Sequence, residues 1–172
     1  MPRLAPAGGL EFRPAPLAVT DFCRGIIDEV RMIAKDQHEF YFEYEGPEYE
    51  HMVDEKLLRH ILSNLLTNAV KYSPRGGRIN TGMKCTGQEL IFTIADQGIG
   101  IPPEDQPQLF ETFHRGNNVG NISGSGLGLA IVKKAVDLHS GQIHLVSEVG
   151  RGTTFTVTIP AIPARHDQDS GR

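Results

Sequence analysis

The sequence predicts an α+β fold, a two-layer sandwich in which about three helices cover one face of a mixed, mostly antiparallel sheet. Three segments have apolar residues at spacings of three and four, the pattern of a helix with one buried face. Six shorter runs have the composition or the alternation of strands, and several occur in neighbouring pairs that favour antiparallel pairing. We expect helices over residues 20–33, 54–72 and 127–139, and strands over residues 38–45, 51–53, 78–85, 89–95, 142–147 and 153–159.

The first helix and the first strand follow from two different periodicities. The helix has apolar residues at positions 22, 26, 27, 30 and 33, and Thr20 is suited to be its N-cap. In the next run Phe40, Phe42 and Tyr44 alternate with charged neighbours until a Gly-Pro pair breaks the pattern. We therefore expect a helix and then a strand, each with one apolar face.

The middle of the chain predicts a long helix followed by a hairpin. Asp54 is expected to cap the helix, whose leucines at positions 58, 62, 65 and 66 lie on one side with Ala69. Pro74 and the glycines after it end the helix. The two β-rich runs that follow are joined through Gly87 in the manner of a hairpin.

The remainder of the chain contains a long glycine-rich loop, a helix and a final strand pair. Residues 96–125 hold most of the turn signals in the sequence, which indicates a functional loop. Helical spacing returns through Leu127, Ile131, Ala135 and Leu138, and Gly141 is placed to end that helix. The last two strands are separated by a turn with two glycines.

Bulk properties indicate one soluble domain. The chain has 172 residues, 39% hydrophobic and 22% charged, with a net charge of −4, so no basic surface predicts binding to nucleic acid. No run is long and apolar enough to cross a membrane, and the N-terminus does not have the pattern of a secretory signal. Cys23 and Cys85 are far apart in sequence, which fits a reducing cytoplasm. We expect a linker at 1–18, a domain at 19–162 and a disordered tail at 163–172.

Polar residues gather along one edge of the helix predicted over residues 54–72. Spacings of four and three place Asn64, Asn68 and Lys71 together, opposite the leucines. An asparagine oxygen is a neutral, hard ligand that suits Mg²⁺, which takes its other ligands from water and phosphates. Taken alone, the pattern is more typical of solvated surface residues.

Two glycine-rich segments suggest a site for a nucleotide. Asp96 ends a strand and is followed by Gly98 and Gly100, so a carboxylate there can accept from an exocyclic amine while the backbone approaches a flat base. The alternative is a turn capped by Asp96. Farther on, Gly124, Gly126 and Gly128 open a helix and can present N–H groups to a phosphate, or they form a hinge without a ligand.

The order of these segments resembles the catalytic ATP-binding domain of the sensor histidine kinases, within the superfamily that includes DNA gyrase, heat-shock chaperones and mismatch-repair ATPases. The resemblance covers about residues 20–160 and implies the Bergerat ATP-binding fold. Five motifs in order are more specific than any one of them. They are an N box at 64–72, a first glycine box at 96–100, an F box at 110–116, a second glycine box at 124–129 and a closing glycine motif at 150–155.

The resemblance implies a role for each matching residue. It implies that Asn68 coordinates Mg²⁺ with support from Asn64, and that Lys71 and the lid residue Arg115 contact phosphates. The implied lid spans about residues 113–125. Phe110 and Phe113 are either apolar anchors of this lid or ordinary core residues. The implied adenine contacts are Tyr72, Asp96 and, through water, Thr153; the other implied nucleotide contacts are Gly98, Gly100, Ile101, Gly124, Gly126, Leu127 and Gly128.

Asn64 bears on the type of reaction. Superfamily members that hydrolyse ATP have a glutamate base at this position, and an amide cannot take a proton from water. The sequence therefore favours phosphoryl transfer to another group, in which positioning and charge neutralisation supply the catalysis. The resemblance thus implies a protein-histidine kinase that uses ATP and Mg²⁺.

The partners implied by the resemblance lie outside the sequence given. Those kinases carry a dimerisation domain with the accepting histidine and act on a response regulator, and nothing here matches that domain. His38 is followed by an acid but lies in a strand pattern, so it is not expected to be the acceptor. We expect a domain that binds ATP but does not phosphorylate itself, from a parent protein that is cytoplasmic or membrane-anchored. A nucleotide-sensing module and an anti-sigma-type serine kinase remain alternatives.

Overall fold

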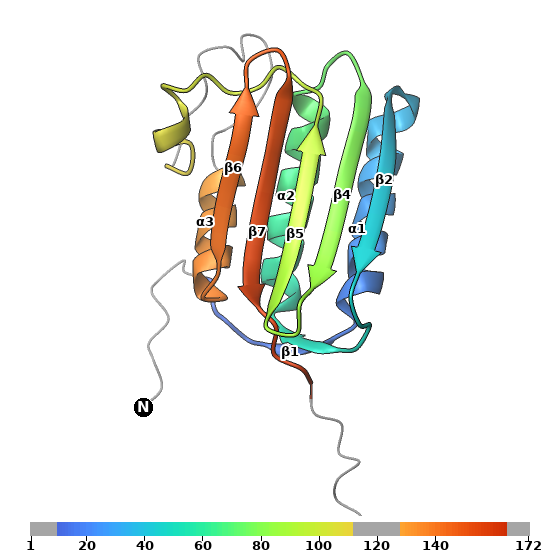
Figure 1. Ribbon diagram of the computed structural model, residues 1–172, viewed down its shortest axis with the longest axis vertical. Coiled ribbons are helices and arrows are strands. Elements are labelled where there is room, and N and C mark those ends of the chain that lie inside the picture. The colour runs from blue at the N-terminus through green and yellow to red at the C-terminus, as the bar shows by residue number, and fades with distance from the viewer. Residues whose placement is uncertain (1–9, 112–127, 165–172) are drawn as a thin grey trace, which may run out of the picture.

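The computed structural model describes residues 10–111 and 128–164. In this part of the chain three helices pack on one face of a five-stranded sheet, whose other face is uncovered (Figure 1). The helices are α1 (Val19–Ala34), α2 (Glu55–Lys71) and α3 (Gly128–Leu138). The expected fold class is confirmed.

The sheet is mixed and mostly antiparallel. Its strand order is β2-β4-β5-β7-β6, in which β2 pairs with β4 in parallel and the other three pairs are antiparallel. The hairpin expected at Gly87 joins β4 to β5. The strands are β2 (His38–Glu45), β4 (Gly77–Cys85), β5 (Glu89–Asp96), β6 (Gln142–Glu148) and β7 (Gly152–Pro160).

A second, two-stranded sheet lies at one end of the molecule, and the pattern of the sequence does not predict its first strand. There β1 (Ala15–Leu17) pairs antiparallel with β3 (His51–Val53). Nearby, the Arg13 amide donates to Asp54 Oδ2 at 2.7 Å. A three-residue strand with Pro16 inside it has no local signal, because its structure comes from pairing with a distant segment. The stretch assigned to a linker therefore contributes to the fold.

The start of α2 agrees with the sequence, whereas the start of α1 differs from it. Asp54 caps α2, since its Oδ1 accepts from the Leu57 amide at 3.0 Å. The helix α1 begins at Val19, so Thr20 lies in its first turn and does not cap it. The Thr20 hydroxyl is buried and faces the Met83 sulfur at 3.9 Å, and packing against the sheet thus replaces capping.

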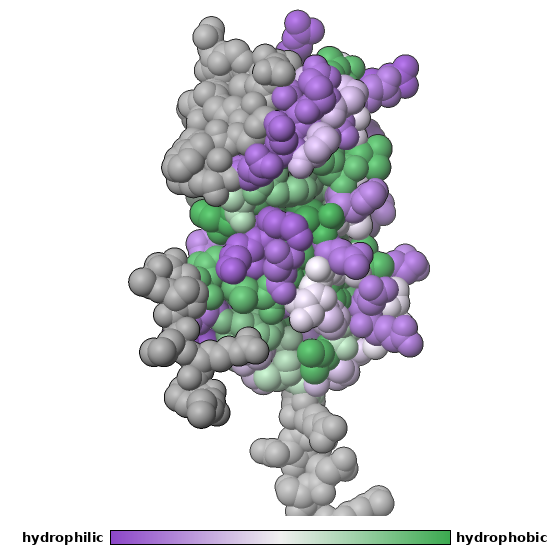
Figure 2. Space-filling model, turned by 90° about the vertical axis from the view of Figure 1, so that its left-hand side faces the viewer, coloured by the Kyte–Doolittle hydropathy of each residue, from purple (hydrophilic) through white to green (hydrophobic). Residues whose placement is uncertain are grey.

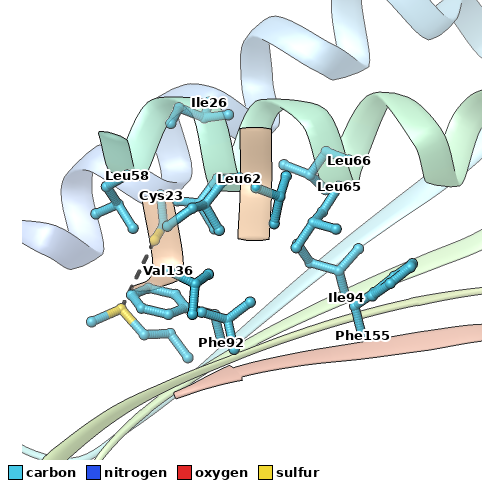
Figure 3. Close-up of a cluster of buried hydrophobic side chains, with 14 of the residues drawn as sticks. Cys23, Ile26, Leu58, Leu62, Leu65, Leu66, Phe92, Ile94, Val136 and Phe155 are labelled. Carbon is cyan, nitrogen blue, oxygen red and sulfur yellow. Dashed lines mark hydrogen bonds between the residues drawn. The ribbon is translucent and has the colours of Figure 1, made fainter. Parts of the chain in front are cut away.

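The core lies between the helices and the covered face of the sheet, as Figure 3 shows. From α2, Leu62 and Leu66 point toward Phe92 and Ile94 of β5, and each is at most 2% exposed. Burial of one such side chain contributes about 1.5–3 kcal/mol. Other labelled members of this cluster are Cys23, Ile26, Leu58, Leu65, Val136 and Phe155.

Three histidines, His38, His51 and His139, are buried and hydrogen-bonded within the fold. His38 Nε2 lies 2.9 Å from the Ser73 carbonyl oxygen. His139 Nε2 accepts from the Asp54 amide at 3.2 Å, and its Nδ1 lies 3.0 Å from the Ala135 oxygen. His51 Nε2 lies 3.6 Å from Cys85 Sγ. Within the described residues, no helix has the length and hydropathy to span a bilayer.

Candidate functional site

Asp96 is the last residue of β5 and lies at the end of the sheet where β6 ends and β7 begins (Figure 1). Its Oδ1 accepts hydrogen bonds from the Gly98 amide at 2.9 Å and the Thr153 amide at 3.2 Å. Nothing in the described part of the chain donates to Oδ2. Burial raises the pKa of the Asp96 carboxyl to about 6, although the Gly98 and Thr153 amides act in the opposite direction. The result is a carboxylate with one oxygen fixed and the other available to a donor.

The loop that follows Asp96 is fastened to the C-terminal end of α2. The Ile99 amide donates to the Tyr72 carbonyl oxygen at 2.9 Å. A Cβ atom at Gly98 would lie 2.0 Å from the same oxygen, so any side chain there would force the backbones apart. This close approach places Tyr72, which is half-buried, next to the loop that begins at Asp96.

The polar edge of α2 continues from this contact. Lys71 is exposed, and Asn68 is half-buried with no side-chain hydrogen bond to any described residue. Asn64 donates from Nδ2 to the His60 oxygen at 2.7 Å, which leaves Oδ1 on the other side of the amide. A Cβ at Gly128 would lie 3.0 Å from that Oδ1, so the first residue of α3 sits against Asn64. The edge thus runs from the Asp96 loop to the start of α3.

The far end of the loop is held by the turn between β6 and β7. The Gly150 amide donates to the Ile99 oxygen at 2.9 Å, and the Ile101 amide donates to Ser147 Oγ at 2.8 Å. Gly100 has a φ of +72°, and a Cβ there would lie 2.1 Å from the Glu148 oxygen. The Ser147 hydroxyl also lies 2.7 Å from Thr153 Oγ1. Sequence reasoning missed Ser147, because its partner Ile101 is distant in the chain.

Several residues predicted to contact the phosphates lie outside the part of the chain that the structure describes. Arg115, Gly124, Gly126 and Leu127 lie outside the described residues, as does the whole predicted lid, including Phe113. Gly128 is described, as the first residue of α3. Phe110 is half-buried and packs edge-on against Phe155, with ring centroids 6.4 Å apart. Figure 2 faces the side that carries β6 and α3, where hydrophobic and hydrophilic groups are interspersed.

These residues form two chemically distinct parts. Asp96 offers an acceptor to an amine, beside a loop whose backbone is exposed by its glycines. The edge of α2 offers amide oxygens and the Lys71 ammonium beside the N-terminus of α3, whose partial positive charge favours an anion. No three His, Cys, Asp or Glu side chains cluster as metal ligands within the described residues. A ligand with an amine at one end and phosphates at the other fits both parts.

Comparison with known proteins places the chain in a family. Residues 53–163 match the model of the histidine kinase-, DNA gyrase B- and HSP90-like ATPases. The chain is 44% identical over 119 residues to the sensor-like histidine kinase SenX3 of Mycobacterium tuberculosis, covering 67% of this chain and 29% of that protein. It is 35% identical over 155 residues to the sensor histidine kinase WalK of Bacillus subtilis, covering 87% and 25%. The chain thus spans less than a third of either relative.

Solved structures give the same result. The mycobacterial sensor histidine kinase MprB has a TM-score of 0.75 and 31% identity, with 87% of this chain and 100% of that one covered. Full-length ShkA in complex with AMPPNP has a TM-score of 0.78 and 28% identity, with 92% and 34% covered. The chain belongs to the family of histidine kinase-, DNA gyrase B- and HSP90-like ATPases, in which it corresponds to the ATP-binding catalytic domain of the sensor histidine kinases.

Proposed function

We propose that this domain holds ATP with Mg²⁺ and positions the γ-phosphate for transfer to a histidine on a separate dimerisation domain of its parent protein. The observation that carries the proposal is the Asp96 carboxylate, with Oδ1 fixed by two backbone amides and Oδ2 without a donor in the described part of the chain. Asp96 is half-buried, so this second oxygen remains open to a donor from a ligand. The exocyclic amine of adenine supplies the missing donor.

The adenine end of the site would use residues from three segments. Asp96 accepts from the amine, and the glycines after it allow the flat base to approach the backbone. Tyr72, which the Gly98 contact holds beside this loop, packs against the base. Thr153 donates its amide to Asp96, and its hydroxyl is available to an ordered water that also contacts the base. Gly100 and Ile101 shape the loop between these groups.

The phosphate end would use the polar edge of α2 and the start of α3. Asn68 suits Mg²⁺ because its amide oxygen is a hard ligand that no described residue engages, and Asn64 lies one turn away. When bound, Mg²⁺ neutralises negative charge on the phosphate oxygens. Lys71 and Arg115 add positive charge. The glycines at positions 124, 126 and 128, with Leu127, bring backbone N–H groups to the phosphates at a helix N-terminus.

The amide of Asn64 favours transfer over hydrolysis. Activation of a water molecule requires a base at the γ-phosphate, and a neutral amide cannot accept that proton. Asn64 instead donates to the His60 oxygen and holds its own oxygen toward α3. The domain would therefore keep ATP intact until an acceptor histidine arrives.

The partners follow from the relatives. SenX3 and WalK are sensor histidine kinases. We propose that the parent of this chain carries a dimerisation domain with the acceptor histidine and passes the phosphoryl group to a response regulator. The domain would work in the cytoplasm, where ATP is supplied, whether or not its parent is anchored to a membrane.

Calorimetric titration with a non-hydrolysable ATP analogue, with and without Mg²⁺, tests the proposal. Asp96→Asn places an NH₂ group opposite the adenine amine, and we expect affinity to fall at least about tenfold, the loss of one charge-assisted hydrogen bond. Asn68→Ala should remove the Mg²⁺-dependent part of the affinity. Asp21→Asn makes the same chemical change at an exposed carboxylate of α1 and should have no effect.

Phosphoryl transfer is tested by adding a separately produced histidine domain from a related kinase with Mg-ATP. We expect label from the γ-phosphate to appear on that domain and not on this chain alone. A folded chain that binds no nucleotide would contradict the proposal, as would hydrolysis of ATP without any acceptor at the rate of an ATPase.

A further inference from the structure

His38 is the first residue of β2 and lies at the same end of the sheet as Asp96, the last residue of β5 (Figure 1). The histidine is 9% exposed, and its Nε2 lies 2.9 Å from the Ser73 carbonyl oxygen. A carbonyl oxygen can only accept a hydrogen bond, so Nε2 carries the hydrogen whether or not Nδ1 is protonated. His38 therefore donates to the residue that directly follows Tyr72.

Two consecutive carbonyl groups at the end of α2 are thus held by two different segments. The Tyr72 oxygen accepts from the Ile99 amide at 2.9 Å, and the Ser73 oxygen accepts from His38. The first bond joins two backbones and needs no particular side chain at either residue. The second depends on the His38 side chain, because the Gly76 amide, which also donates to the Ser73 oxygen, belongs to the same turn. His38 is therefore a side-chain tie between this turn and β2.

Backbone contacts keep the same turn against β2 independently of the imidazole. Gly76 has a φ of +81°, and a Cβ atom there would overlap the Gln37 carbonyl oxygen. The next residue, Gly77, pairs with His38 in the parallel ladder of β2 and β4. Loss of the His38 side chain should therefore loosen the turn without separating it from β2, and variants at this position should fold.

We propose that His38 is a positioning residue for the bound nucleotide, because it fixes the segment that carries the Tyr72 ring. The inference rests on the proposed function, in which Tyr72 packs against the base. Tyr72 is half-buried, and its backbone lies between the bond from Ile99 and the bond from His38. A ring that is held before the base arrives loses little conformational freedom on binding, which preserves affinity. His38 acts through Tyr72, since its own donor is engaged by Ser73.

Two substitutions at position 38 separate the hydrogen bond from the packing of the side chain. His38→Met fills the buried space with a flexible side chain that has no donor. His38→Gln places an amide nitrogen at about the reach of Nε2 and can donate to the Ser73 oxygen. Calorimetry with a non-hydrolysable ATP analogue and Mg²⁺ gives the dissociation constants. We expect a rise of about three- to tenfold in His38→Met and a return to within about twofold of the unaltered chain in His38→Gln.

A double-mutant cycle with Tyr72→Ala tests whether the effect passes through the ring. In the Tyr72→Ala background, His38→Met should change the dissociation constant no further, because the group that His38 holds is absent. An equal further loss in that background would overturn the inference, as would an unchanged dissociation constant in His38→Met. His38→Asn, whose shorter amide does not reach the Ser73 oxygen, is a second variant without the bond and should show the same loss.

His139→Met is the matched control for loss of a buried histidine. His139 accepts from the Asp54 amide at the start of α2, at the opposite end of this helix from Tyr72. This variant should lower the free energy of unfolding and leave the dissociation constant unchanged. The same result at position 38 would make His38 a purely structural residue and overturn the inference, while binding by the unaltered chain upholds the proposed function. If the unaltered chain binds no nucleotide, both fail.

Discussion

The Thr153 amide donates to Asp96 Oδ1 at 3.2 Å, so the carboxylate that ends β5 is held by the second residue of the neighbouring strand, β7. These residues are far apart in the chain and become neighbours because β5 and β7 pair antiparallel. The same carboxylate accepts from the Gly98 amide. The candidate site is therefore built on the sheet.

The buried Asp96 carboxylate should reduce stability at neutral pH. Its pKa is raised by burial from 3.8 to about 6, so the folded state binds more protons than the unfolded state between these values. Stability from this group therefore falls as pH rises through that window, by up to about 3 kcal/mol. We expect Asp96→Asn to be more stable than the unaltered chain at pH 7.5, with the gap closing toward pH 4. Urea unfolding at both pH values measures it; an equal gap at both would contradict the assignment.

Gly98 should tolerate no side chain. Gly98→Ala would bring Cβ within 2.0 Å of the Tyr72 oxygen, and we expect a loss of at least about 2 kcal/mol together with weakened nucleotide binding. Gly25→Ala is the matched control, because Gly25 lies in α1 with nothing near its Cβ position. That change should stabilise the protein by about 0.5–1 kcal/mol. Thermal unfolding of the two variants should shift in opposite directions.

Leu62 tests the core beneath the site. It is 1% exposed, and Leu62→Ala should cost about 2–5 kcal/mol through lost burial and a residual cavity. Met32→Ala removes a side chain that is 82% exposed and should change stability by less than about 0.5 kcal/mol. Urea denaturation gives both free energies of unfolding. A loss below about 1 kcal/mol for the leucine variant would contradict the close packing of Leu62 in this core.

His139 should make the fold sensitive to acid. Burial lowers the pKa of His139 below 6.5, so the unfolded state binds the proton more readily. Stability from this group is thus present above pH 6.5 and is lost as pH falls below it. Protonation also removes the acceptor at Nε2 that the Asp54 amide uses. We expect a shallower loss between pH 7 and 5 in His139→Gln than in the unaltered chain, while the exposed His144→Gln keeps the full slope.

Local patterns predicted most of the fold because most elements have one buried face. The alternation of Phe40, Phe42 and Tyr44 and the leucine spacing of α2 gave the correct element types and nearly the correct bounds. The strand β1 was missed, because its three residues acquire structure by pairing with β3. Thr20 was misread for a similar reason, since its partner Met83 belongs to the sheet.

The site divides in the same way. Asn64, Asn68 and Asp96 could be chosen from sequence because each has a local signal, a shared helix edge or a strand end followed by glycines. Ser147 has no such signal, since its partners Ile101 and Thr153 meet it through loop and sheet geometry. Contacts between residues that are distant in the chain could therefore be found only in the structure.

The central claim is that nucleotide binds at the end of β5. The most direct measurement is a titration of the ¹⁵N-labelled chain with Mg-ADP, followed through its backbone amide resonances. We expect saturable shifts of Gly98, Ile101 and Thr153, and none at Glu89 in the hairpin at the other end of β5. The absence of any saturable shift in a folded chain, or shifts confined to the hairpin end, would contradict the account.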